Sequence, residues 1–345
     1  MNAQLRQPLK QTSRSFYLTL RALPAPVRPQ IGLAYLLART TDTIADTGLI
    51  SVERRLAALQ KLRERIQGNR GVTLDFGELA RHQGSPAERV LLERCEESLA
   101  ALAALPSQDA PLVRAVLVTI TSGQELDLRR FAGASAQNVV ALQTDADLDD
   151  YTYRVAGCVG EFWTKICRAR LFPQAKLDDA QLLSDGVRFG KGLQLVNILR
   201  DLPADLRQGR CYLPTERLAG LGLQPADLLK PENEPTLRPL YHEYLDCALA
   251  HLEAGWAYTN ALPRGQMRVR LACAWPILIG ARTLQRLRAA EVLDPQQRVK
   301  ISRREVRGIR CRSVLRYPSR AAWARQFAEA RDTRGKAVAS RGDLA

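Results

Sequence analysis

The sequence has few of the residues that bind transition metals, and no pattern that would gather them. Its 345 residues include three histidines without metal-ligand spacing and seven scattered cysteines without a Cys-x-x-Cys pair. These absences exclude a zinc site built on a local motif and predict reduced thiols. A cytoplasmic protein is therefore expected.

Long hydrophobic runs are missing as well. The longest, residues 271–281, is too short to cross a bilayer and contains Pro276, so a buried helix is predicted there. The first 14 residues are polar and basic, without the apolar core of a signal peptide. We expect neither a signal peptide nor a transmembrane segment.

No stretch has the alternation of β-branched and polar residues that is typical of strands. Helical periodicity instead covers residues 30–45, 51–67, 85–105, 112–131, 148–171, 178–202, 239–262 and 267–293. Clusters of Pro and Gly separate these segments, and none is long enough for a flexible linker. The sequence predicts one all-α domain over residues 1–300 and a tail over residues 301–345.

Positive charge is concentrated in the tail. The net charge is +15, and residues 298–345 carry +10 of it, with 14 Lys/Arg against 4 Asp/Glu. Arginines there alternate with apolar residues, a pattern that predicts peripheral contact with an anionic membrane. These apolar residues are Val306, Ile309, Val314, Leu315, Trp323 and Phe327. Disorder is predicted from about Thr333; nucleic-acid binding is the alternative for the tail and is not expected.

Two helical segments each carry a narrow polar stripe among apolar residues. The first stripe is Tyr35, Arg39, Asp42 and Asp46; the second is Gln194, Asn197, Asp201 and Asp205. Steps of three and four residues place each set on one helix face. A narrow polar stripe in apolar surroundings is typical of the lining of an interior cavity.

The two Asp-x-x-x-Asp pairs in these stripes predict a magnesium–diphosphate site. Such a pair projects two carboxylates in one direction, and Mg²⁺ commonly joins carboxylates to substrate phosphates. Cations on a diphosphate neutralise the charge that builds as its C–O bond breaks. For either pair alone, a solvated helix end is the alternative. Pro203 is expected to end or kink the second helix near Leu202, which would place Asp205 on a distorted turn.

Two further segments carry candidate functional residues. Arg14 lies in a Ser-Arg-Ser-Phe segment and could pair with phosphate oxygens, although a surface arginine is the alternative. Residues 151–160 place aromatic rings and an arginine before Gly157 and Gly160. Glycine in mid-helix costs about 1 kcal/mol against alanine, so either close helix packing or function should require the space.

Together these segments resemble the squalene/phytoene synthase family of head-to-head prenyl transferases. The resemblance runs from Ser13 to about Arg304, with motifs in family order: Ser-Arg-Ser-Phe at 13–16, YLLARTTDTIAD at 35–46, YTYRVAG at 151–157 and GLQLVNILRDLPADLRQGRCYLP at 192–214. It implies an isoprenoid-synthase helical bundle around a central apolar cavity, with both acidic motifs at the mouth.

The resemblance also implies roles for individual residues. The Mg²⁺ ligands would be Asp42, Asp46, Asp201 and Asp205. The diphosphate contacts would be Ser13, Arg14, Phe16, Tyr35, Arg39, Gln194 and Arg200. Tyr151 would manage the proton lost in the first half-reaction. Where relatives often carry an additional acid, this chain has Ala45 and Ala204, which leaves the number of ions open.

Two features resemble the squalene branch of the family, which couples two farnesyl diphosphates and then reduces the product with NADPH. They are Ala-Cys-Ala-Trp-Pro at residues 272–276 and Val-Lys-Ile at 299–301. Lys300 and Arg303 would contact NADPH phosphates, and Asn197 would lie on the nicotinamide side. The alternative is that these cations merely begin the tail. Without a Gly-rich Rossmann fingerprint, the cofactor site would be unconventional.

The resemblance therefore predicts a monomeric squalene synthase that uses farnesyl diphosphate, Mg²⁺ and NADPH. The first alternative is a non-reducing member of the family, whose product would be presqualene diphosphate, dehydrosqualene or phytoene. A second alternative, from a different class, is a non-catalytic basic helical protein that binds RNA or anionic lipid.

Overall fold

The computed structural model describes residues 7, 9, 12 and 16–332, and nearly all of their regular structure is helical. The helices of the first half are α2 (Phe16–Ala22), α3 (Arg28–Asp46), α4 (Val52–Gln67), α5 (Gly77–Arg81), α6 (Pro86–Glu93), α7 (Cys95–Ala103) and α8 (Ala110–Arg130). Those that follow are α9 (Asp145–Thr152), the π-helical turn η1 (Tyr153–Gly157), α10 (Cys158–Leu171), α11 (Asp179–Arg207), α12 (Thr215–Ala219), the 3₁₀ turns η2 (Pro225–Leu229) and η3 (Pro231–Asn233), α13 (Glu234–Ala261), α14 (Met267–Ala289), α15 (Arg303–Arg316) and α16 (Arg320–Arg331). The all-α prediction is confirmed.

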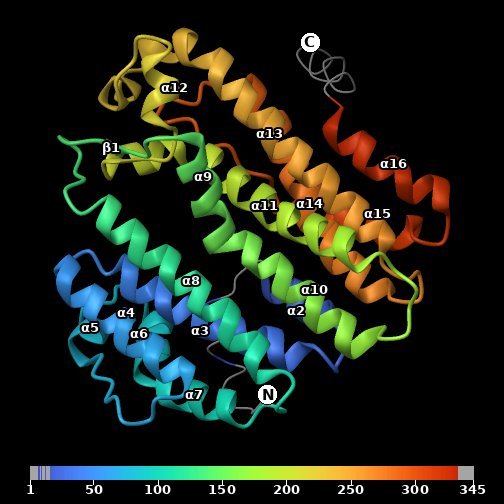
Figure 1. The fold of residues 1–345 in the computed structure, drawn as a ribbon. Helices are drawn as coiled ribbons and strands as arrows, with labels where there is room; N and C mark the ends of the chain where they lie inside the picture. Colours follow the sequence, from blue (N-terminus) through green and yellow to red (C-terminus); the bar gives the residue numbers. More distant parts are fainter. Residues whose placement is uncertain (1–6, 8, 10–11, 13–15, 333–345) are drawn as a thin grey trace.

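Helix α8 joins the two halves of the bundle (Figure 1). It packs against α3 and α4 on one side and against α10 and η1 on the other. Beyond it, α11 packs against α10 and α13, and α13 packs against α14. Buried apolar side chains form two clusters, one around α3, α4 and α8 and one around α11, α13 and α14. The expected helical segments are present, except that the segment at 85–105 is divided at Arg94 into α6 and α7.

Helix α11 continues through Pro203 to Arg207, so of the expected end or kink near Leu202 the end is wrong and the kink stays a prediction. Proline cannot donate the hydrogen bond that the carbonyl of Leu199, four residues earlier, would normally accept. The buried Tyr241 of α13 supplies the missing donor, because its hydroxyl donates to the Leu199 oxygen at 2.9 Å. A side chain 42 residues away in the sequence therefore allows the helix to carry Asp205 on regular backbone.

Glycines set the spacing of α11 against α10 and η1. A Cβ on Gly160 would lie 1.8 Å from the carbonyl oxygen of Gly186, and one on Gly190 would lie 2.1 Å from that of Ala156. No side chain fits at these distances, so the two backbones touch directly. Close packing, one of the two explanations for Gly160 in mid-helix, accounts for it.

The tail forms two helices that pack against the hydrophobic core. Helices α15 and α16 pack against α14, and Trp323 and Phe327 stack on Trp256 with ring centroids 5.2 and 5.6 Å away. Together with Ile309 these side chains are buried in the core and are not available to a membrane. Contact of the tail with a membrane stays a prediction. Val314 and Leu315 remain 43% and 79% exposed. Residue 300 as a domain boundary stays a prediction, and the predicted disorder lies outside the described residues.

A short parallel strand pair closes one end of the bundle. Strand β1 (Val140–Ala141) pairs with β2 (Arg210–Cys211), with Val140 opposite Arg210. The pairing fixes the segment that follows α11 and therefore positions Arg210. Within the part of the chain that the structure describes, no helix is long and apolar enough to cross a membrane.

Candidate active site

The polar stripe of α3 is its accessible face. Tyr35, Arg39 and Asp42 are partly exposed and Asp46 is exposed, whereas between residues 30 and 45 every other residue except Ala38 is buried. On α11, Gln194, Asp201 and Asp205 are likewise partly exposed, and Asn197 is exposed. The sequence therefore identified the face of each helix that solvent or a ligand can reach.

The first acidic pair lies in a hollow. The Asp42 side chain is 43% exposed, yet burial is the leading cause that raises its pKa to about 6, followed by the charge of Asp46. A carboxylate that solvent touches but protein atoms largely surround lines a concave surface. Burial also raises the pKa of Asp46.

The second acidic pair has the same character. Burial, and then the charge of Asp201, raises the pKa of Asp205 to about 7. Arg200 forms hydrogen bonds to the Asp201 carboxylate at 2.9 and 2.5 Å. On α3, Arg39 pairs with Glu88 of α6 and lies 3.8 Å from Asp42. Of the three predicted diphosphate-binding arginines, Arg39 and Arg200 therefore already face carboxylates.

Arg210 links carboxylates from three helices, and the sequence reasoning missed this role. Its positive charge lowers the pKa of Asp46 on α3, of Asp127 on α8 and of Asp205 on α11. Its guanidinium lies 3.8 Å from the Asp127 carboxylate. Arg210 thus interacts with one carboxylate of each acidic pair. We call the two acidic pairs together with Asp127 the acidic hollow. Arg210 belongs to the 192–214 motif, so a signal for it was present.

Asp127 was also missed. It lies on a helix that was recognised only by its apolar period, and burial raises its pKa to about 6. Gln124, one turn earlier, donates a hydrogen bond to the Asp42 carboxylate. Polar residues three apart on an apolar helix, as in both stripes, would have been the signal.

Tyr151 reaches the acidic hollow through a second tyrosine. Its ring stacks on that of Tyr212 with centroids 4.8 Å apart, and the two hydroxyls lie 3.4 Å apart. The Tyr212 hydroxyl donates to Asp127 at 3.1 Å. Burial raises the pKa of Tyr151, and the charges of Asp127, Asp205 and Asp42 raise it further. The phenol therefore stays protonated beside both acidic pairs.

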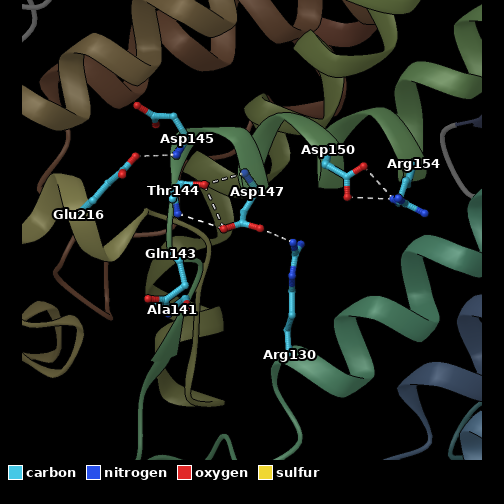
Figure 2. Close-up of polar contacts among 9 residues, drawn as sticks. All are labelled: Arg130, Ala141, Gln143, Thr144, Asp145, Asp147, Asp150, Arg154 and Glu216. Carbon is cyan, nitrogen blue, oxygen red and sulfur yellow. Dashed lines mark hydrogen bonds and ion pairs between the residues drawn. The ribbon is translucent and has the colours of Figure 1, made fainter.

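Polar contacts anchor the start of α9, the helix that carries Tyr151 (Figure 2). Thr144 and Asp147 form a reciprocal capping box, and Arg130 at the end of α8 forms an ion pair with Asp147 at 2.5 Å. Such a box satisfies donors at the first turn that have no partner within the helix. The Glu216 carboxylate accepts from the amide of Asp145 at 2.9 Å. These contacts tie α9 to α8 and α12.

Other predicted site residues are placed less directly. The Tyr35 hydroxyl donates to the carbonyl of Thr12 at 3.2 Å. Lys300 and Arg303 are exposed, and within residues 16–332 no hydrogen bond or ion pair joins them to the acidic hollow. Ser13 and Arg14 lie outside the described residues, and Phe16 begins α2 with a side chain that also lies outside them.

The donor set fits a hard cation shared with a ligand. Among the residues that the structure describes, no three acidic, histidine or cysteine side chains gather closely enough to hold a metal alone. Each pair offers two carboxylates, and the charge of Asp46 raises the pKa of Asp42 as the charge of Asp201 raises that of Asp205. A bound cation would relieve this repulsion. Mg²⁺ is compatible with such pairs because it keeps several waters and takes phosphate oxygens.

Known proteins are similar to this chain in sequence. The chain is 30% identical over 282 residues to a bifunctional lycopene cyclase/phytoene synthase of Leptosphaeria maculans, covering 80% of this chain and 45% of that protein. It is 30% identical over 250 residues to the presqualene diphosphate synthase of Rhodopseudomonas palustris, covering 72% and 76%. It is 27% identical over 293 residues to the squalene synthase of Bos taurus, covering 80% and 61%. The chain spans about half the length of several curated relatives that it matches.

The fold is shared as well. The solved complex of TcSQS with the ligand BPH1237 aligns with a TM-score of 0.76 at 22% identity, covering 95% of this chain and 90% of that one. The model of the squalene/phytoene synthase family matches residues 9–305. This span contains both acidic pairs, Tyr151 and Arg210. The chain therefore belongs to the squalene/phytoene synthase family.

Proposed function

We propose that this chain is a squalene synthase, which joins two farnesyl diphosphates head to head and reduces the presqualene diphosphate formed to squalene. The observation that carries the proposal is the meeting of both acidic pairs around Arg210, beside the protonated Tyr151. Such a reaction needs three things at one place: carboxylates for cations, positive charge for a diphosphate, and a group that carries a proton.

Asp42, Asp46, Asp201 and Asp205 would hold Mg²⁺. When bound, Mg²⁺ supplies neutralisation of the charge that develops on a departing diphosphate. Arg39 and Arg200 would exchange their present carboxylate partners for phosphate oxygens. Planar guanidinium groups suit this role because they bind phosphate in a bidentate manner. Arg210 would add a third positive charge, and Ser13, Arg14, Phe16, Tyr35 and Gln194 would complete the diphosphate contacts.

The proton released in the first half-reaction would leave through a chain of hydroxyls. Tyr151 would pass its own proton to Tyr212 as it accepts the new one, and Tyr212 would pass its proton to Asp127. The oxygen–oxygen distances of 3.4 Å from Tyr151 to Tyr212 and 3.1 Å from Tyr212 to Asp127 support the transfer. With a pKa of about 6, Asp127 can accept a proton near neutral pH and release it again.

Apolar walls would protect the cationic intermediates from water. Leu193, beside Gln194 of the second stripe, is apolar and only partly buried, so it would belong to such a wall. Water excluded from the site cannot capture a carbocation as an alcohol.

The reductive step rests on different residues. NADPH supplies a hydride when bound, and Asn197, Lys300 and Arg303 would hold it. Their exposure leaves them accessible to a cofactor. Without this step the chain would be a presqualene diphosphate, dehydrosqualene or phytoene synthase, which are siblings in the family.

One incubation tests the proposal: purified chain with farnesyl diphosphate and Mg²⁺, with and without NADPH, followed by identification of the lipids. Squalene formed only with NADPH is the expected result. Dehydrosqualene or presqualene diphosphate in both tubes would refute the reductive step, and no prenyl product in either would refute the enzyme assignment in favour of a binding protein.

A further inference from the structure

A second hollow lies at the other end of α13, away from the acidic pairs. It has a volume of about 370 Å³ and lies between the end of α13, the start of α14 and the α15–α16 connection. Its lining residues include Asn260, Arg264, Arg270, Tyr317, Arg320 and Trp323. We call this site the arginine hollow.

The arginine hollow is distinct from the acidic hollow. Tyr241 of α13 contacts Leu199, two residues before Asp201. Asn260 lies 19 positions further along the same helix, which at 1.5 Å per residue is about 28 Å. A ligand here would therefore not contact the acidic pairs.

Arg270 is a buried cation without an acidic partner. It is 6% exposed, and no carboxylate in residues 16–332 forms a salt bridge with it. Its guanidinium donates to the Leu262 carbonyl at 3.3 Å and to the Asn260 side chain at 2.9 Å, while its Nε has no hydrogen-bond partner. Leaving a charge buried and unpaired is costly.

Aromatic rings hold this cation at the wall of the hollow. The guanidinium carbon lies 5.6 Å from the Tyr317 centroid and 5.5 Å from that of Trp323. These contacts help to attach the tail helices to the core, since cation–π pairs are attractive at such distances. Attachment alone, however, does not require further cations around the same space.

Two more arginines line the hollow from the surface. Arg264 is exposed and donates to the carbonyls of Tyr317 and Pro318 at 3.4 and 3.1 Å. Arg320, also exposed, begins α16. The lining contains no Asp or Glu. Three guanidinium groups around one space without a carboxylate match an anion that accepts several hydrogen bonds.

We propose that the arginine hollow is a second anion site, which binds a phosphate group. The group could belong to free phosphate or to the headgroup of an anionic phospholipid. Val314 and Leu315 lie within three residues of Tyr317 and remain exposed, so an apolar surface is available to a lipid that presents its headgroup here. The proposal does not depend on the reaction assigned above.

The test compares two arginines of α16 that differ in position alone. Arg320 lines the hollow, whereas Arg325, also exposed, does not. The full chain and its Arg320→Ala and Arg325→Ala variants are titrated with inorganic phosphate by calorimetry, without Mg²⁺. Saturable binding that Arg320→Ala weakens about tenfold, and that Arg325→Ala leaves within twofold, is expected. No saturable binding, or equal weakening in both variants, would overturn the proposal.

A vesicle assay then identifies the source of the phosphate. The same proteins are sedimented with phosphatidylcholine vesicles with and without phosphatidic acid. If Arg320→Ala loses binding to the acidic vesicles and Arg325→Ala keeps it, the site takes a lipid headgroup. If both variants keep vesicle binding while only Arg320→Ala loses inorganic phosphate, the site takes free phosphate. Arg264→Ala should repeat the Arg320→Ala result in either case, and failure to do so would contradict the shared site.

Discussion

The acidic hollow and the arginine hollow lie near the two ends of α13 and treat charge in opposite ways. In the first, aspartates gather with Arg39, Arg200 and Arg210 among them. In the second, three arginines gather and no carboxylate lines the space. The mixed site can exchange arginine partners when a diphosphate enters, whereas the purely basic site has no internal partner to exchange. We therefore expect turnover at the acidic hollow and binding alone at the arginine hollow.

The largest expected effect comes from removing one carboxylate of the acidic hollow. Asp201→Asn keeps the shape of the side chain but removes its negative charge and so weakens the binding of Mg²⁺. The charge on the departing diphosphate should then not be neutralised, and turnover should fall by about a thousandfold. Prenyl product formation with Mg²⁺ measures this. Glu93→Gln, at an exposed position, is the matched control. Full turnover in Asp201→Asn would refute the Mg²⁺-binding role proposed for this carboxylate.

The hydroxyl chain should give the next largest effect. Tyr151→Phe should lower kcat about a hundredfold, and Tyr212→Phe about tenfold, because the first carries the proton directly and the second through one further bond. Single-turnover kinetics of the first half-reaction report both. If Tyr212→Phe matched the wild type, Asp127 would have no part in proton removal.

Arg210 should control the pH dependence of the acidic hollow. Asp42 and Asp205 have pKa values of about 6 and 7, so kcat/KM should fall as the pH drops through this range and the carboxylates become protonated. Arg210→Met removes a positive charge that lowers the pKa of Asp205. The acidic limb should therefore move upward by about one pH unit. Arg210→Lys should keep the wild-type limb, and an unmoved limb in Arg210→Met would refute the electrostatic role.

The smallest effect concerns the contact between α11 and α13 near Pro203. Tyr241→Phe leaves the Leu199 carbonyl without its donor and should lower the free energy of unfolding by about 1–3 kcal/mol, as measured in urea. Pro203→Ala restores a backbone N–H at the same carbonyl. The double variant should therefore lose less than the sum of the single changes, and strict additivity would contradict this account of α11.

The sequence was informative wherever the decisive contacts were local. Periodicity predicted the helices, and steps of three and four residues identified the accessible faces of α3 and α11. The end of α11 was mispredicted because the compensating hydroxyl of Tyr241 comes from another helix. A rule about proline in isolation cannot include that partner.

Contacts between distant segments explain what the sequence missed. Asp127 and Arg210 meet only because α8 and β2 are brought together in the fold. Trp323 and Phe327 had the pattern of a membrane-facing surface, but Trp256 provides rings on which they stack. An amphipathic pattern specifies that a face is apolar and does not specify what covers it.

The close contacts of α11 with α10 and η1 restrict which substitutions this chain can accept there. Where Gly160 meets Gly186 and Gly190 meets Ala156, backbone touches backbone, so mutation has no side chain there to shorten or enlarge. In this chain, a change of site shape would therefore have to arise at other positions. These contacts hold α11, the helix that carries Asp201 and Asp205, at a fixed distance from its neighbours.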